Sequence, residues 1–141
     1  MTAANHSFAG FQRSEDTVRI YLSGNLLFRS AEQGIRPLLT YLRKFSPCPE
    51  NVTVFDRIVG NGAALLLKKT SCRKVHSIVG SETAAETLKR LGITYSFQTT
   101  VPFISNRAGD GMCPFEKASI GKSPDEFYNF AQEATTSGRK G

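Results

Sequence analysis

Three side chains in this sequence could take part directly in a reaction: Cys113, Asp56 and Glu116. Cys113 directly precedes an expected short helix, and a helix N-terminus favours the thiolate form of a cysteine. Arg107 could add to this effect. The alternative is structural, because Cys113 at the N-cap and Glu116 three residues later form the pattern of a simple helix cap. A cysteine nucleophile also needs a base, and neither histidine of the sequence stands at an obvious position for one.

Asp56 is unusual because it stands among apolar residues in an expected strand over residues 52–59. Burying an unpaired carboxylate costs free energy. Asp56 therefore faces solvent, pairs with Arg57 or another cation, or serves a site near the carboxyl end of its strand. The last option leads to one hypothesis, a zinc-independent enzyme in which Cys113 acts with Asp56 or Glu116.

Three junctions share one layout, in which a strand end is followed by a small or glycine-rich turn and a helix N-terminus. They cover residues 59–63, 79–82 and 109–114. Ligands of open α/β sheets bind at the carboxyl ends of the strands, and helix N-termini favour anions. We therefore expect a small anionic or nucleotide-like ligand, bound by Gly60, Asn61, Gly62, Ala63, Ser81, Asn106, Arg107 and Gly111. The alternative is that these tight turns use glycine for backbone geometry alone.

Neither a cofactor nor a metal is expected. Residues 60–65 match only part of the dinucleotide-binding fingerprint, because Leu65 stands where the third glycine would be. Cys72 and His76 have the spacing of a helical metal site, but the chain between them passes into an expected strand, where that geometry fails.

The elements that would position these residues follow from periodicity and turn signals. We expect strands over residues 17–22, 26–28, 52–59, 75–79 and 93–97, and helices over residues 35–45, 63–69, 82–91, 114–120 and 124–134. A hairpin followed by alternating helices and strands predicts an α/β fold with three α-β-α layers and a mixed central sheet. Residues 1–16 are predicted to be a flexible lead-in, residues 17–134 one domain, and residues 135–141 a disordered tail.

Composition narrows the classes of function. The chain has 141 residues with a net charge of +6, and its longest dense apolar run, residues 63–67, is far too short for a membrane span. The excess basic charge is spread over several pairs of residues, two of them at expected helix ends, and no basic stripe with interleaved aromatics is visible. We therefore do not expect nucleic acid as a partner. Three cysteines without CxxC spacing and the lack of a signal-like start favour a reducing, cytoplasmic setting.

Several stretches together resemble a known family. Residues 56–65, 93–95, 106–107 and 113–116 are similar to domain-of-unknown-function family 1893, over roughly residues 17–120. The resemblance implies a divergent cytidine-deaminase-like fold. Zinc deaminases need His-x-Glu on one helix and Pro-Cys-x-x-Cys on another, and here those positions offer only Cys113. The resemblance therefore implies a deaminase-like domain without zinc catalysis.

A third hypothesis is an interaction or oligomerisation module, which would make the protein a homo-oligomer. An exposed apolar strip on the first hairpin, formed by Ile20, Leu22, Leu26 and Phe28, would favour it.

Overall fold

The computed structural model describes residues 3–136, with side chains over residues 8–135. Its elements are α1 (Ala3–Arg13), β1 (Val18–Leu22), β2 (Asn25–Ser30), α2 (Arg36–Lys44), β3 (Val52–Val59), α3 (Asn61–Lys69), β4 (Cys72–Ser81), α4 (Glu82–Arg90), β5 (Thr94–Val101), α5 (Pro114–Ser119) and α6 (Pro124–Thr136). From β1 onward this is the order predicted from the sequence. The predicted strand over residues 75–79 was too short, since β4 extends from Cys72 to Ser81.

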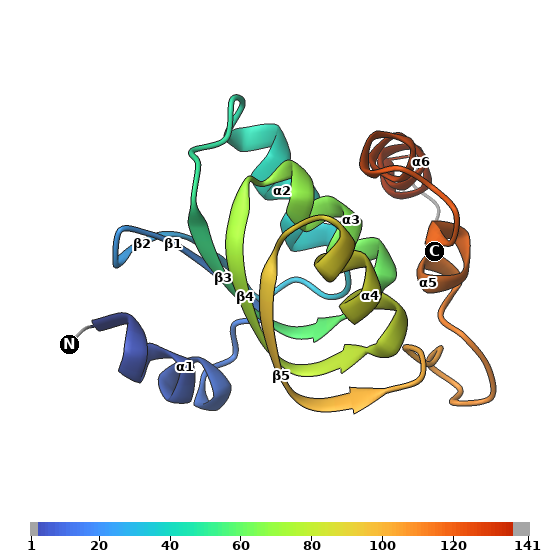
Figure 1. The fold of residues 1–141 in the computed structure, drawn as a ribbon, viewed down its shortest axis with the longest axis horizontal. Coiled ribbons are helices and arrows are strands. Elements are labelled where there is room, and N and C mark those ends of the chain that lie inside the picture. The colour runs from blue at the N-terminus through green and yellow to red at the C-terminus, as the bar shows by residue number, and fades with distance from the viewer. Residues whose placement is uncertain (1–2, 137–141) are drawn as a thin grey trace.

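The five strands form one mixed sheet in the order β2-β1-β3-β4-β5 (Figure 1). β1 is antiparallel to both β2 and β3, whereas β3, β4 and β5 are parallel. The mixed sheet of an α/β fold is thereby confirmed. The parallel strands bring the carboxyl ends of β3 and β4 to the same edge of the sheet, which is where ligands bind in such folds.

The helices that connect the strands all lie on one face of the sheet. α2, α3 and α4 pack side by side against it, and α5 and α6 pack on the outside of α3 (Figure 1). α3 is apolar all round, with Leu65, Leu66 and Leu67 fully buried, because it is enclosed by the sheet on one side and by helices on the others.

Within residues 3–136, α1 alone covers the opposite face (Figure 1), so the prediction of a flexible lead-in over residues 1–16 is wrong for residues 3–13, and its first two residues lie outside the described residues. Phe11 is fully buried and stacks with Phe8, and both rings contact Phe55 of β3. The Arg57 guanidinium lies 5.1 Å from the centre of the Phe11 ring and donates to the backbone oxygen of Phe11 at 3.0 Å and to that of Asp16 at 2.7 Å. Sequence periodicity did not predict this helix, because the contacts that stabilise it come from Phe55 and Arg57 of β3, more than 40 positions further along the chain.

The last helix extends beyond the boundary predicted at residue 134. Thr135 and Thr136 belong to α6 rather than to a tail. The rest of the predicted disordered tail, residues 137–141, lies outside the described residues.

The apolar strip proposed on the hairpin is not exposed as a unit. Ile20 is fully buried, and Leu22 and Phe28 pack against the core, so that only Leu26, 48% exposed, remains accessible. The strip therefore gives no support to an interface at this hairpin.

Candidate functional site

A cavity of about 200 Å³ opens at the carboxyl end of β3. Its lining comes from residues 33–35 before α2, from the end of β3, from the first turn of α3 and from the start of α5. Six predicted site residues line it: Asp56, Gly60, Gly62, Ala63, Cys113 and Glu116. The turns at residues 60–63 and 109–114, nearly 50 positions apart in sequence, thus contribute to one site.

Asp56 is the buried acid of this cavity. Its side chain is 5% exposed and accepts a long hydrogen bond of 3.4 Å from the backbone N–H of Ile58. Burial raises the pKa of Asp56 well above its ordinary value, because the charged form is poorly solvated there. The carboxyl therefore keeps its proton to higher pH than an exposed aspartate does, and a protonated carboxyl can both donate and accept a hydrogen bond.

Arg57 does not neutralise Asp56, because the two adjacent side chains point to opposite faces of β3. Arg57 also contributes to the cavity lining, but its guanidinium donates to backbone oxygens at the end of α1. The option that Asp56 pairs with Arg57 is therefore wrong. Among the described residues, the lining contains no other lysine or arginine.

Glu116 has a defined structural role at the start of α3. Its carboxylate accepts hydrogen bonds from the backbone N–H of Asn61 at 2.6 Å, from Thr83 Oγ1 at 3.2 Å and from the backbone N–H of Ile104 at 3.3 Å. A carboxylate at a helix N-terminus satisfies a free N–H group and interacts favourably with the helix dipole. The Glu116 carboxylate thus occupies the N-terminus of α3, where the sequence analysis expected an anionic ligand to bind.

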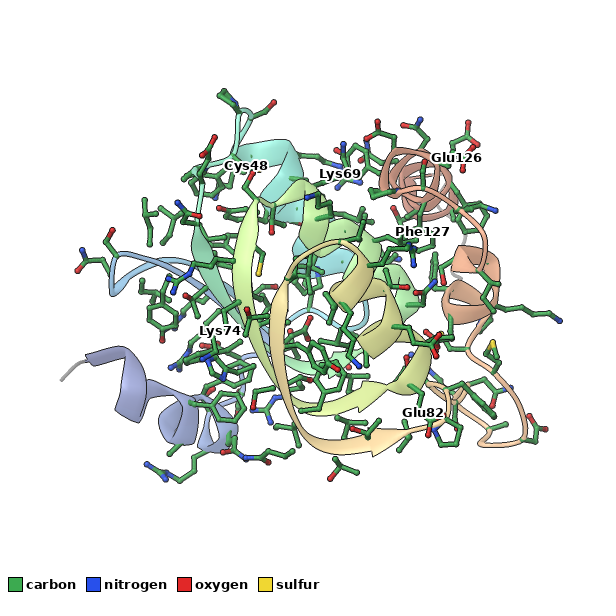
Figure 2. All side chains as sticks on the ribbon, viewed as in Figure 1. Cys48, Lys69, Lys74, Glu82, Glu126 and Phe127 are labelled. Carbon is green, nitrogen blue, oxygen red and sulfur yellow. The ribbon has the colours of Figure 1, made fainter. Side chains whose placement is uncertain are left out.

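Gly60 and Gly62 are required by close packing rather than by backbone conformation. A Cβ atom on Gly60 would overlap the Glu116 carboxylate, and one on Gly62 would lie 2.6 Å from Cζ of Phe127. Phe127 points from α6 toward α3 (Figure 2). The glycines therefore let α5 and α6 approach the start of α3, and they leave part of their own surface in the cavity lining.

Two predicted ligand residues point away from the cavity. The Asn61 side chain is buried between helices, where Nδ2 donates to Ser119 Oγ at 2.9 Å and Oδ1 accepts from Thr87 Oγ1. Ser81 is the N-cap of α4, and its Oγ accepts from the backbone N–H of Ala84 at 3.0 Å. Asn61 thus links α3 to α4 and α5, Ser81 caps α4, and neither residue lines the cavity.

The loop before α5 places its predicted residues outside the lining as well. Asn106 closes its own turn, accepting from the backbone N–H of Gly109 at 2.8 Å and donating to Asp110 Oδ1 at 3.0 Å. The Gly111 oxygen accepts from the backbone N–H of Asn106 at 2.8 Å, and Arg107 is exposed. None of these three residues lines the cavity.

Cys113 is half-buried in the cavity wall at the N-cap of α5, and its side chain makes no cap hydrogen bond. Among the side chains described, those of residues 8–135, the one histidine is His76, and it does not line the cavity. His76 lies on the other face of the sheet, 5.8 Å from the ring of Phe8 and 5.5 Å from that of Phe55. Burial lowers the pKa of His76, with a smaller contribution from Lys74.

The lining also includes residues that sequence reasoning missed, namely Thr17, Gln33, Gly34, Ile35, Ile58, Ile104 and Phe115. Ile58 and Phe115 stand beside predicted site residues on β3 and α5, whereas no motif marks the others, which the fold brings to the cavity from the segments around the hairpin and after β5. Over residues 3–136, no three His, Cys, Asp or Glu side chains are grouped so that they could hold a metal ion. No helix in the same part of the chain is long and apolar enough to cross a membrane.

Comparison with known proteins places the chain in a family without an assigned function. The model of the family described as TM1506, domain of unknown function (DUF1893), matches residues 10–134. A crystal structure of a DUF1893 family protein (TM1506) from Thermotoga maritima is 26% identical, with a TM-score of 0.85 over 94% of this chain and 89% of that one. A search of curated proteins finds no match.

Proposed function

This chain belongs to the domain-of-unknown-function family DUF1893, and we propose that its cavity binds a small, planar, nucleobase-like ligand through the Asp56 carboxyl. The observation that carries this proposal is a buried carboxyl, with its pKa raised by burial, in the wall of a cavity. A planar carboxyl that carries a proton presents a donor and an acceptor side by side. The edge of a nucleobase presents the matching acceptor and donor.

The size and charge of the cavity support an uncharged ligand. At about 200 Å³ it is smaller than the roughly 300–1,000 Å³ typical of sites for drug-sized molecules. The one cation in the described lining, Arg57, is engaged at α1, and Glu116 already serves the start of α3. A phosphate group would find no free partner among these residues, so the base or nucleoside part of a nucleotide is what this cavity suits.

We test this by titrating nucleobases, nucleosides and nucleoside monophosphates into the protein by calorimetry between pH 5 and pH 8. The expected result is binding at low pH that weakens as Asp56 ionises. Asp56→Leu should lower affinity by roughly tenfold to a hundredfold, the equivalent of one or two buried hydrogen bonds. Asp110→Asn, which changes an exposed carboxyl, should leave affinity unchanged. The absence of binding at millimolar ligand, or equal affinity in Asp56→Leu, would refute the proposal.

We also propose that the family is a divergent branch of the cytidine-deaminase-like fold that has lost zinc catalysis. The five-stranded mixed sheet and the convergence of residues 60–63 with residues 113–116 support this view. At the two turns where a deaminase carries its zinc ligands, the chain offers one thiol, Cys113, and the carboxylate of Glu116. Zinc analysis of the purified protein by atomic absorption, with stoichiometric zinc as the contrary result, tests the proposal. Three free cysteines are compatible with the cytoplasmic setting that we propose for it.

A second candidate function is covalent catalysis by Cys113, because this thiol shares the cavity with Asp56, an acid whose pKa is raised by burial. In such a reaction the Cys113 thiol first loses its proton to solvent water, and the thiolate sulfur bonds to a ring carbon that is double-bonded to nitrogen or oxygen. The π bond of that carbon breaks, and its electron pair goes to the nitrogen or oxygen, which takes the proton of Asp56. Alkylation of Cys113 that a bound nucleobase slows would support this function. Labelling of Cys113 at the same rate with and without ligand would count against it.

A further inference from the structure

The sheet ends on a strand whose outer edge is unpaired. β5 pairs with β4 along one side, and within residues 3–136 no strand pairs with its other side. Figure 1 shows β5 at the margin of the sheet. The outward N–H and C=O groups of such a strand can pair with another chain, and proteins usually prevent this with charges, proline, bulges or covering segments.

β5 carries none of the usual protection. Residues 91–106, which include all of β5, contain no Lys, Arg, His, Asp or Glu, although 21% of the whole chain is charged. This stretch is not buried, since Thr94, Ser96 and Gln98 are among its exposed side chains. The first proline of the stretch, Pro102, comes only after the strand has ended.

The opposite edge strand of the same sheet is protected. β2 has six residues against eight in β5, it carries the exposed Arg29, and its pairing with β1 contains an irregularity between Ile20 and Tyr21. An irregularity of this kind increases local twist and hinders pairing with another strand. Because one edge of the sheet is protected and the other is not, we expect the open edge of β5 to pair with another strand.

We propose that β5 pairs antiparallel with β5 of a second copy of this chain, joining the two sheets into one of ten strands. An antiparallel pair of identical strands is self-complementary about a two-fold axis. Each copy has a net charge of +6, so like charge opposes pairing least where the contacting surface carries no charged side chain. Residues 91–106 form such a surface along the open edge. Phe103, two residues beyond the end of β5 and 37% exposed, adds apolar area at the end of the paired edge.

The same features argue against a foreign partner strand. A strand from another protein is selected through pockets or charges that recognise its side chains, and β5 presents small uncharged side chains such as Ser96 and Thr100. Eight residues of strand span roughly 27 Å, which is enough for about eight hydrogen bonds between the two copies. The interface is therefore narrow, and we expect a dimer that forms in the micromolar range.

The test is sedimentation velocity of the full chain between 5 and 500 µM. For a pairing centred on Gln98, the double variant Ser96→Lys/Thr100→Lys places like charges opposite each other across the axis, which disfavours the pairing. The control, Asn25→Lys/Ala31→Lys, adds the same charge at exposed positions of the β2 edge. The expected result is a dimer for the wild type and the control, and at least a tenfold weaker dimer for the β5 variant.

Two further measurements keep the proposal falsifiable. Thermal unfolding confirms that each variant is folded, and hydrogen exchange of the wild type at low and high concentration needs no variant. We expect amides of β5 to exchange more slowly at high concentration. A wild type that is monomeric at 500 µM, equal weakening in both variants, or exchange in β5 that does not depend on concentration would overturn the proposal. A monomer that captures a peptide strand at β5 would overturn it in favour of a foreign partner.

Discussion

Asp56 should make the protein less stable as the pH rises, and Asp56→Asn should remove that dependence. The folded state holds the proton more tightly than the unfolded chain, because burial raises the pKa of Asp56 above its ordinary value. Between the two pKa values the folded state binds more protons than the unfolded state. The free energy of unfolding therefore falls as the pH increases, by up to about 1.4 kcal/mol per pH unit from this one group.

The measurement is urea unfolding at pH 4.5, 5.5 and 6.5. The chain has no tryptophan, so circular dichroism of the helices reports the transition. Other carboxyls titrate in the same range, so the informative quantity is the difference in free energy of unfolding between wild type and Asp56→Asn. We expect that difference to shift in favour of the variant by about 1 kcal/mol or more for each pH unit.

The matched control is Asp110→Asn, which removes a carboxyl from an exposed loop. If the difference between wild type and Asp56→Asn stays constant with pH, Asp56 ionises in the folded state much as it does in the unfolded chain, and the reasoning is refuted. A shift of equal size in the control would also refute it, because the effect would then come from net charge and not from burial.

Three further predictions concern the packing around the cavity and its thiol. Gly62→Ala should destabilise the protein by about 1–3 kcal/mol in urea unfolding, because the new methyl group meets the Phe127 ring and must displace it; an unchanged midpoint would contradict this packing. Arg57→Met should release α1 from the sheet, because it removes the hydrogen bonds from the guanidinium to the backbone at the end of the helix. Proteolysis followed by mass spectrometry should then detect faster cleavage within residues 3–13 than in the wild type. Equal resistance of variant and wild type would show that apolar contacts alone hold α1 in place. Iodoacetamide should modify Cys113 before Cys48 and Cys72, since burial raises the pKa of both of these thiols and brings that of Cys72 to about 12. Modification of Cys72 at the same rate as Cys113 would contradict this and would mean that the core around Cys72 opens.

Much of the fold could be predicted because it is encoded locally. Alternation in residues 18–22, the turn at residues 23–24, and the Ser-Pro-x-Glu start of α6 each act over a few residues. Their order then restricts the topology, since an α/β alternation gives parallel strands joined by helices. The turns at residues 60–63 and 109–114 could be predicted to lie close together for the same reason, because the ends of parallel strands and the starts of the following helices share one edge of the sheet.

The roles of individual site residues depended on contacts across long stretches of sequence. Glu116 bonds to the backbone of Asn61, 55 positions away, so the carboxylate expected to cap its own helix stabilises another one. The Asn61 side chain bonds to Ser119 of α5 and Thr87 of α4, and so it points away from the cavity. No local pattern encodes which of several buried donors a carboxylate will meet, because the choice depends on how the helices pack.

The sequence by itself determined that Asp56 stands in an apolar strand and that glycine-rich turns precede α3 and α5, since residue type and spacing are local properties. Only the tertiary structure decided that the pKa of Asp56 lies well above its ordinary value, because desolvation depends on what packs over a group and not on its neighbours in the chain. The tertiary structure alone likewise decided that residues 3–13 form a helix, which contacts with Phe55 and Arg57 hold against the sheet. A short helix is marginal in water without such packing.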